Sequence, residues 1–327
     1  MKIAVFGIGG IGGIVGGALA RGPEALSQRG PEALSQRPPA ETYFIARGKN
    51  LEAIRREGLR VESPAVGDFT VRPVLASDRA EDLGLMDAVI VACKGYDLEA
   101  ACAAIAPMVG PETLVVSLLN GVLVSEVMEP LLPQCVLADG VIYIFSHLEG
   151  PGHVVQTSGL CRVTLGMRDG SQPAALTELA DLLNQGGVRT DVSGNILVDS
   201  WRKYARVCSL GVMCAYYDGP VGKAREDPAH EAVLREVIGA MTAVAAARGV
   251  TLPPDLPDQL VETFEKERPD TITSLYRDLR SGKPAERTEL RHLVGRMVEM
   301  GREAGIPTPY HQAVLERYSA SFMLPVR

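Results

Sequence analysis

The feature that most constrains the fold of this chain is its N-terminus, where an apolar run leads directly into closely spaced glycines. Ile3 to Phe6 has the length and composition of a strand, and Gly7-x-Gly9-x-x-Gly12 follows it at once. The apolar, Gly- and Ala-rich segment from Ile14 to Ala20 then predicts a helix. The N-terminus is therefore expected to fold as a strand, a tight turn and a helix.

Three glycines at this spacing have distinct physical uses in such a unit. The first permits the turn, the second lets the backbone approach a pyrophosphate, and the third lets the helix pack closely on the strand. The pyrophosphate then lies over N–H groups at the positive end of the helix dipole. Glycine is common in this chain, at 34 of 327 residues, so the position of the pattern carries the prediction. We expect Gly7, Gly9 and Gly12 to bind a dinucleotide; a Gly-rich packing turn without a ligand is the alternative.

Composition and charge narrow the classes of partner. With 46% hydrophobic and 22% charged residues, the chain is expected to be globular and long enough for two domains. The net charge of −7, without a long basic run, argues against a nucleic-acid partner. No apolar stretch reaches about 18 residues, so no membrane partner is expected. The N-terminus has the pattern of a buried strand rather than a leader peptide, and the resulting expectation is a cytoplasmic protein.

The cysteines and histidines do not form a metal-binding pattern. Six cysteines and five histidines are scattered along the chain without a Cys-x-x-Cys pair. Most of the cysteines lie within apolar runs, where a free thiol packs as a small hydrophobic group. Neither a metal site nor a disulfide framework is expected.

A tandem octapeptide follows the first expected helix. Gly22 to Arg29 is repeated without change as Gly30 to Arg37. Two copies are too few for a solenoid, whereas a loop between a helix and a strand accepts an insertion at low cost. We interpret the repeat as a duplication in a surface loop, although each copy could form a helical turn after its proline.

The residue that follows the second expected strand, Thr42 to Ala46, distinguishes between the two nicotinamide cofactors. An acidic residue here would accept hydrogen bonds from the ribose hydroxyls of NAD, whereas arginine accommodates the 2′-phosphate of NADP. The chain has Arg47, with Lys49 two residues further on. A planar guanidinium pairs with a phosphate through charge-assisted hydrogen bonds, so NADP(H) is expected. The alternative is an arginine that is simply solvated in a loop.

Polar residues also follow two later strands. The continuous apolar runs Asp87 to Cys93 and Thr113 to Leu119 are typical of parallel strands buried on both faces. Lys94 follows the first run and Asn120 follows the second. Ligands of open α/β sheets bind beyond the carboxyl ends of the strands, so both residues are expected at the edge where the glycine turn lies. Taken singly, each could be an ordinary loop residue.

The character of the chain changes near Gly194, because only helices are expected after it. We therefore predict a dinucleotide-binding domain over residues 1–194 and a helical domain over residues 195–327. The expected helices of the second domain are Asn195 to Tyr217, Pro228 to Arg248, Asp258 to Glu267, Thr271 to Ser281, Glu286 to Ala304 and Tyr310 to Phe322. The apolar residues of these helices would permit a homodimer.

Lys203 lies in the first of these helices, which is nearly all apolar after Arg206. A helix of that kind is buried all round. Desolvation disfavours a charged ammonium, so a buried Lys203 would have a lowered pKa. The alternative is a surface lysine whose stem follows the apolar face while its charge reaches water.

Pieces distributed along essentially the whole chain together resemble the ketopantoate reductase (2-dehydropantoate 2-reductase) family. The matching pieces are Gly7-x-Gly9-x-x-Gly12, Phe44-Ile-Ala-Arg-Gly48, Val91-Ala-Cys-Lys94, Asn120-Gly121, Trp201-Arg-Lys203, Ser274-Leu-Tyr-Arg-Asp278, Gly282-Lys-Pro-Ala-Glu286 and Gly305-Ile-Pro-Thr-Pro309. None of them is specific alone, whereas the combination is. The resemblance implies an α/β protein with an N-terminal Rossmann domain, an all-helical C-terminal domain, and reduction of a 2-oxo acid by NADPH in the cleft between them.

The resemblance also implies roles for individual residues. Arg47 would contact the 2′-phosphate, and Lys94 would contact the cofactor. Asn120 would contact both cofactor and substrate. Lys203 would bind the substrate and act as the general acid.

Two further roles fall in the helical part. By resemblance, Ser274 would contact the substrate carboxylate, and Glu286 would position cofactor or substrate. The spacing of the two residues places Glu286 at a helix N-terminus, where the macrodipole stabilises a carboxylate. Without the resemblance, a helix-surface hydroxyl and a plain capping carboxylate are the simpler interpretations.

Four positions depart from the family pattern. The family commonly has asparagines four and eight residues after the catalytic lysine, where this chain has Val207 and Gly211. Around Glu286, Ala285 and Thr288 stand in place of a threonine and an aspartate. A pocket that hydrogen-bonds a substrate hydroxyl discriminates strongly and an apolar pocket does not, so these departures allow a different 2-oxo acid as substrate.

Three hypotheses follow. The first is NADPH-dependent reduction of 2-dehydropantoate (ketopantoate) to pantoate in pantothenate and coenzyme A biosynthesis. The second keeps the fold, the cofactor and Lys203 but changes the 2-oxo acid. The third is a non-catalytic NADPH-binding sensor. Because a sensor needs only the glycine turn and Arg47, the joint presence of Lys203, Asn120, Ser274 and Glu286 argues for an enzyme.

Overall fold

The computed structural model describes residues 1–22 and 40–320, so the duplicated octapeptide lies outside the described residues apart from Gly22. The chain divides into two compact units. The first comprises Met1–Leu119 and Leu123–Asp199, and the second comprises Asn120–Val122 and Ser200–Arg327. The domain boundary after residue 194 stays a prediction; this division falls slightly later, within the first turn of α6 (Ile196–Tyr216).

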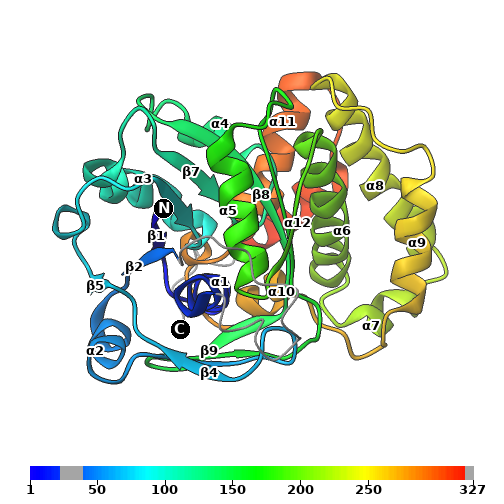
Figure 1. Cartoon of the computed structure of the whole chain (residues 1–327). Helices are drawn as coiled ribbons and strands as arrows, with labels where there is room; N and C mark the ends of the chain where they lie inside the picture. The colour runs from blue at the N-terminus through cyan, green and yellow to red at the C-terminus, as the bar shows by residue number, and fades with distance from the viewer. Residues whose placement is uncertain (23–39, 321–327) are drawn as a thin grey trace. The chain divides into compact units, whose positions relative to one another are not determined.

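The first unit is built on an eight-stranded sheet with the order β12-β11-β8-β7-β6-β1-β2-β5. Its strands are β1 (Lys2–Phe6), β2 (Glu41–Ile45), β5 (Leu75–Ser77), β6 (Ala88–Val91), β7 (Leu114–Ser117), β8 (Val136–Tyr143), β11 (Arg162–Gly166) and β12 (Arg189–Val192) (Figure 1). Six neighbouring strands of this sheet pair in parallel, in the order β8-β7-β6-β1-β2-β5. This is the order of a doubly wound dinucleotide-binding sheet. The Rossmann fold expected from the sequence is confirmed.

The apolar strands of this sheet supply a core on each face. Alternate residues of β1 belong to different clusters: Ile3 and Val5 pack in one, and Ala4 and Phe6 pack in the other. This two-sided burial explains why the central strands are continuous apolar runs. The other helical elements of the unit are α2 (Gly48–Glu57), α3 (Leu98–Ile105), α4 (Val124–Met128) and α5 (Ala174–Gln185), with 3-10 turns η4 (Ala80–Asp82), η5 (Gly95–Asp97) and η6 (Ala106–Met108).

Helix α1 (Gly10–Arg21) is rich in glycine because it packs against two sheets. The second sheet has the order β4-β3-β10-β9, with β3 (Leu59–Glu62), β4 (Phe69–Val71), β9 (Ser146–Gly150) and β10 (His153–Gln156). A Cβ at Gly16 would lie 2.9 Å from Cε1 of Phe44 in β2, and one at Gly13 would lie 2.4 Å from Cγ2 of Val154 in β10. Neither side of α1 has room for larger side chains at these positions.

The regular elements among the described residues of the second unit are all helical. Besides α6 it contains α7 (Val221–Arg225), α8 (His230–Ala247), α9 (Leu256–Lys266), α10 (Ser274–Leu279), η7 (Ala285–Arg287), η8 (Arg291–Gly295), α11 (Arg296–Ala304) and α12 (Pro309–Ala320). Trp201 and Tyr204 of α6 are fully buried and pack edge to face, with ring centroids 5.7 Å apart. As expected from its apolar sequence, α6 is the core helix of this unit.

The single helix expected from Glu286 to Ala304 is wrong. A lone 3-10 turn, η7, comes first, and η8 is a π-turn in which the N–H of Arg296 bonds the carbonyl oxygen of Arg291. Regular α-helix starts only with α11. A π-turn carries one extra residue, and hydrophobic periodicity cannot distinguish it from a regular helix.

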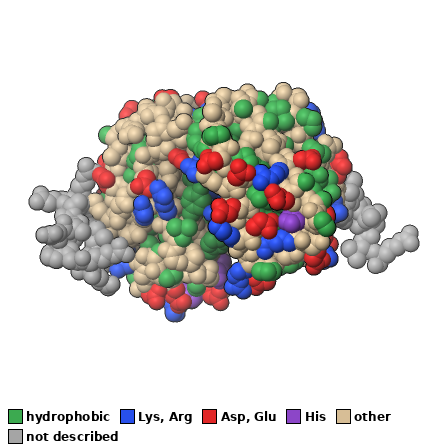
Figure 2. Space-filling view, turned by 90° about the vertical axis from the view of Figure 1, so that its right-hand side faces the viewer, with side chains coloured by type: hydrophobic (Ala, Val, Ile, Leu, Met, Phe, Trp, Pro, Cys, Tyr) green, Lys and Arg blue, Asp and Glu red, His purple; other side chains and the backbone are tan. Residues whose placement is uncertain are grey.

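The surface carries charges of both signs. Figure 2 shows Asp, Glu, Lys and Arg side chains interspersed on one face of the molecule. On α8, for example, Arg235 pairs with Glu231 and with Asp258 of α9, at 2.8 Å in each case. Within residues 1–22 and 40–320, no helix is long and apolar enough to cross a membrane, and no three metal-ligating side chains come together.

Candidate active site

The glycine turn joins β1 to α1 through a backbone that requires glycine at two positions. Gly7 has a φ of +94°, which L side chains rarely adopt. A Cβ at Gly12 would lie 2.1 Å from the carbonyl oxygen of Gly7, so α1 packs too close to the turn for a side chain there. A Cβ at Gly9, by contrast, would meet no atom within 4 Å. The three environments match a tight turn, an open approach to the backbone and a close packing contact.

The N-terminus of α1 fits the pyrophosphate of a dinucleotide. Gly9 is the N-cap residue, and no side chain caps the first turn. The N–H groups and the dipole of such a terminus attract phosphate. Since only a hydrogen atom stands at Gly9 in place of a side chain, a phosphate could reach these N–H groups.

Arg47 and Lys94 follow the two strands that flank β1. Arg47 comes after β2 as the N-cap of α2, and Lys94 comes after β6 as the N-cap of η5. Both residues are exposed. The guanidinium carbon of Arg47 lies 5.9 Å from the ring centroid of Phe6, the last residue of β1. The structure therefore brings the glycine turn, Arg47 and Lys94 to one edge of the sheet, where the strand order reverses.

Asn50 is a residue of this edge that the sequence analysis missed. Its Nδ2 donates to the carbonyl oxygen of Ile8 at 2.8 Å, and its Oδ1 accepts from the N–H of Gly152 at 2.7 Å. Asn50 thereby connects the glycine turn to the hairpin between β9 and β10. An asparagine within an expected helix has no spacing that would have marked it.

Lys203 is buried in the second unit, which excludes the surface alternative. The residue is 8% exposed, and burial lowers the pKa of its ammonium to about 8. The negative charge of Glu289 opposes part of this lowering. Its Nζ donates to Oδ1 of Asn120 at 2.8 Å. Two residues expected at the substrate, 83 positions apart in the chain, are thus in direct contact.

With Gly121 and Val122, Asn120 groups with the helical unit, although the chain on both sides of this segment belongs to the sheet unit. Its main-chain oxygen lies 2.5 Å from Nε2 of His292. Gly121 has a φ of +121°, and a Cβ there would lie 2.6 Å from the same nitrogen. Glycine at position 121 is therefore required for the backbone to approach the imidazole.

The buried carboxylate that acts on Lys203 is that of Glu289. Glu286 is exposed on the 3-10 turn η7, whereas Glu289 is 4% exposed. The interruption of the expected helix accounts for the difference, because the residues after η7 turn inward before regular helix begins. The role that the resemblance implies for Glu286 stays a prediction, whereas the carboxylate whose charge acts on Lys203 is that of Glu289. Ser274 is the first residue of α10 and is exposed.

Comparison with models of protein families shows to which family the chain belongs. A family model described as "Ketopantoate reductase PanE/ApbA" matches residues 3–170, and the corresponding C-terminal model matches residues 195–320. The chain belongs to the ketopantoate reductase family. Its members are NAD(P)-dependent oxidoreductases, which supports an enzyme over the non-catalytic sensor.

Relatives within the ketopantoate reductase family match nearly the whole chain. A 2-dehydropantoate 2-reductase of Mesorhizobium japonicum is 28% identical over 337 residues, which cover 96% of each chain. An uncharacterized oxidoreductase of Bacillus subtilis, YkpB, is 26% identical over 98% of this chain and 99% of its own. A PanE/ApbA family ketopantoate reductase from Ralstonia eutropha superposes with a TM-score of 0.83 at 28% identity, over 99% of this chain and 100% of that chain.

This member of the ketopantoate reductase family has no polar side chain on α6 at the positions four and eight residues after Lys203. Val207 is half-buried one turn after Lys203, and Gly211 is buried one turn further. A Cβ at Gly211 would lie 3.0 Å from Cδ2 of Leu275, which follows Ser274 on α10. Leu275 therefore fills the space that a side chain at position 211 would need.

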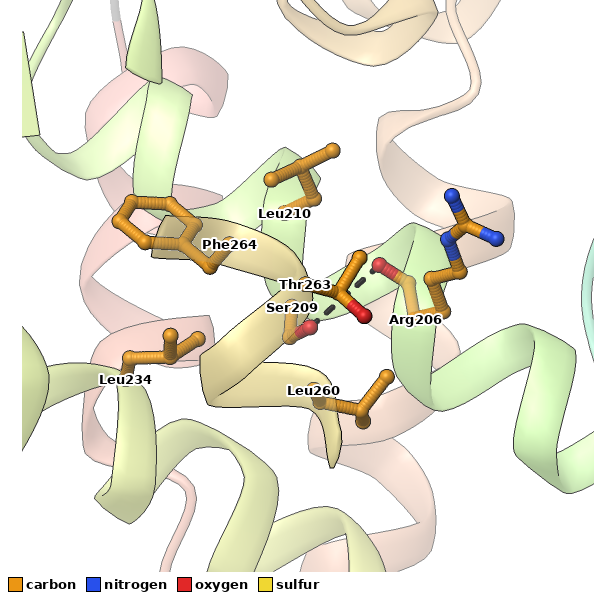
Figure 3. Close-up of a pocket in the computed structure, with 7 residues that line it drawn as sticks. All are labelled: Arg206, Ser209, Leu210, Leu234, Leu260, Thr263 and Phe264. Carbon is orange, nitrogen blue, oxygen red and sulfur yellow. Dashed lines mark hydrogen bonds between the residues drawn. The ribbon is translucent and has the colours of Figure 1, made fainter. Parts of the chain in front are cut away.

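Two cavities lie away from the residues expected at the site. The first is lined by Arg206, Ser209 and Leu210 of α6, Leu234 of α8, and Leu260, Thr263 and Phe264 of α9 (Figure 3). Its volume of about 10 Å³ holds roughly one water molecule. The second, of about 530 Å³, lies in the first unit beside Ser125 and Arg168. Neither is lined by any of the residues expected at the site.

Proposed function

We propose that the chain reduces 2-dehydropantoate to pantoate with NADPH, a step of pantothenate and coenzyme A biosynthesis. The observation that carries this proposal is the buried Lys203, whose ammonium donates to Asn120 and whose lowered pKa of about 8 suits a proton donor near neutral pH. Membership in the ketopantoate reductase family and the open N-terminus of α1 support the same activity.

The proposed roles of the residues follow from the charge that develops on the ketone oxygen. NADPH, when bound, supplies a hydride to the ketone carbon. Lys203 donates its Nζ proton to the oxygen as negative charge builds there. Because Oδ1 of Asn120 accepts from Lys203, its Nδ2 remains as a donor toward the substrate. The carboxylate of Glu289 favours the charged form of Lys203 and so keeps the donor protonated despite burial.

The preference for NADPH over NADH is proposed from Arg47. Arg47 is exposed directly after β2, at the place where an acidic residue would favour NAD. The sequence from Ala46 to Leu51 contains no acidic residue. A guanidinium here can make two parallel hydrogen bonds to the 2′-phosphate.

We expect Arg47→Ala to raise the KM for NADPH by about 10- to 100-fold, since hydrogen bonds to charged groups contribute about 1.5–3 kcal/mol. The KM for NADH should change by less than about twofold, because NADH lacks the phosphate. Steady-state kinetics with each cofactor measures both values. Arg56→Ala, an exposed arginine on the same helix, is the matched control. Equal changes for the two cofactors in Arg47→Ala would remove the proposed role.

A second candidate function is reduction of a 2-oxo acid with an apolar side chain. Val207 and Gly211 favour it, because neither position carries a polar side chain that could bind a substrate hydroxyl, and Leu275 fills the space beside Gly211. The fold, the cofactor and the role of Lys203 are the same in both candidates.

A matched pair of substrates distinguishes the two candidates. 2-Dehydropantoate and 3,3-dimethyl-2-oxobutanoate differ only in the terminal hydroxyl. A site built to bind that hydroxyl should prefer 2-dehydropantoate by about 10⁴-fold in kcat/KM, whereas an apolar site should discriminate by about 100-fold or less. NADPH oxidation by the purified protein measures both constants. Preference for the compound without the hydroxyl would establish the second candidate, and turnover of neither would contradict both.

A further inference from the structure

His292 is a titratable residue that the proposed chemistry does not use. It lies in the π-turn η8, and its Nε2 is 2.5 Å from the main-chain oxygen of Asn120. A carbonyl oxygen can only accept a hydrogen bond, so Nε2 carries a proton and donates it. This bond joins residues 172 positions apart. The imidazole nitrogen is therefore a fixed donor to the Asn120 backbone rather than a base at this atom.

Hydrogen bonds close a ring that includes this contact. The hydroxyl of Tyr204 donates to the carbonyl oxygen of Leu293, the residue after His292. Tyr204 in turn follows Lys203, which donates to Asn120. Three hydrogen bonds form the ring: Lys203 to Asn120, His292 to Asn120, and Tyr204 to Leu293. Peptide bonds complete it, because His292 precedes Leu293 and Lys203 precedes Tyr204. A closed network restricts each of its members more than one isolated hydrogen bond would.

We propose that His292 is a positioning residue, whose Nε2–H holds the Asn120 backbone so that Asn120 Oδ1 meets Lys203 Nζ. This inference rests on the proposed function of Lys203 as the general acid. Segment Asn120–Val122 lies between residues of the other unit, so its attachment to the helical unit depends on contacts such as this one. A catalytic group displaced by 1 Å can lose about 100-fold in rate, so a contact that fixes Asn120 bears directly on turnover.

Two substitutions of similar length separate the hydrogen bond from packing. His292→Gln keeps an N–H donor at the position of Nε2, whereas His292→Met fills the space without a donor. We expect the Met variant to lower kcat by about 10- to 100-fold. The Gln variant should recover kcat to within about threefold of the parent protein, and the KM for NADPH should change little in both.

The pH profile supplies a readout that loss of packing would not move. An oxygen acceptor favours the charged form of Lys203, as does the carboxylate of Glu289 that faces it. If Asn120 is no longer held against Lys203, the pKa of Lys203 should fall further. The basic limb of the kcat–pH profile of His292→Met should therefore lie at lower pH than that of the parent. In His292→Gln the limb should return toward the parental position.

His230→Met is the matched control, because His230 is also half-buried in this unit and its Nδ1 contacts a main-chain oxygen, that of Asp227, at 2.7 Å. It should leave kcat and the pH profile unchanged.

Equal kcat values for the Met and Gln variants of His292, or a parental pH profile in the Met variant, would overturn the proposal. If thermal melting shows that the Met variant does not fold, the Gln variant decides: kcat below about a tenth of parental would contradict the role. Loss of activity in His292→Met alongside full activity in Lys203→Ala would contradict the proposed function instead.

Discussion

Lys203→Ala is expected to lower kcat by about 10²- to 10⁴-fold, the usual contribution of a general acid. Lys203 is the buried ammonium of the helical unit that contacts Asn120, and its removal leaves Asn120 without its donor. The glycine turn, Arg47 and Lys94, which are expected to hold most of the cofactor, belong to the other unit, so the dissociation constant of NADPH should change little. Stopped-flow turnover and fluorescence titration of NADPH measure the two quantities separately. Lys223→Ala, an exposed lysine of the same unit, is the control.

Activity of the parent protein should fall as pH rises through about 8, because the protonated amine is the donor and burial lowers the pKa of Lys203 to that value. A solvated lysine would place this limb near its ordinary pKa of 10.5. Lys203→Arg should restore little activity, since guanidinium does not release its proton near neutrality. Parental kcat in Lys203→Ala at saturating NADPH and 2-oxo acid would require another proton donor, and the mechanism would be abandoned.

Gly12→Ala is expected to destabilise the first unit by about 3 kcal/mol, at the upper end of the usual cost of overpacking. The added Cβ would lie 2.1 Å from the carbonyl oxygen of Gly7 and 3.1 Å from Cβ of Ala92. A backbone oxygen cannot rotate away as a flexible side chain can, so β1 and α1 would have to separate. Urea unfolding followed by circular dichroism should show a lower midpoint, and NADPH binding should weaken with it.

Gly9→Ala is the informative partner of that variant. Gly9 has a φ of −102°, and its Cβ would meet no atom within 4 Å, so the free energy of unfolding should not change. Its methyl group would nevertheless occupy the approach to the α1 N-terminus, and NADPH binding should weaken by about tenfold, equivalent to about 1.4 kcal/mol. Unchanged NADPH affinity in Gly9→Ala would indicate that the pyrophosphate lies elsewhere. Unchanged stability in Gly12→Ala would contradict the packing argument.

The sequence predicted the sheet unit well because its signals are local. Continuous apolar runs identified β6 and β7, and the strand ends placed Arg47 and Lys94 beside the glycine turn. Parallel strands connected by helices leave few possible orders for the sheet, so residues at consecutive strand ends could be expected at one edge. The role of Asn50 was not predicted, because its two hydrogen bonds join it to Ile8 and Gly152, and neither partner lies at a characteristic spacing from it in the sequence.

The helical unit was predicted less completely. The family resemblance pointed to Glu286, but Glu286 is exposed on the 3-10 turn η7, and the buried carboxylate is that of Glu289. The attachment of Asn120 to this unit, through Lys203 at 83 positions and His292 at 172 positions of separation, has no counterpart in any local pattern.

By itself, then, the sequence determined the Rossmann architecture, the glycine turn and the residue types from which cofactor binding and proton transfer are proposed. It could do so because backbone conformation and strand burial depend on neighbouring residues. Which carboxylate acts on Lys203, and which imidazole holds Asn120, was decided only by the tertiary structure. Contacts between distant residues depend on how helices pack and where a turn gains a residue, and these are properties of the folded chain as a whole.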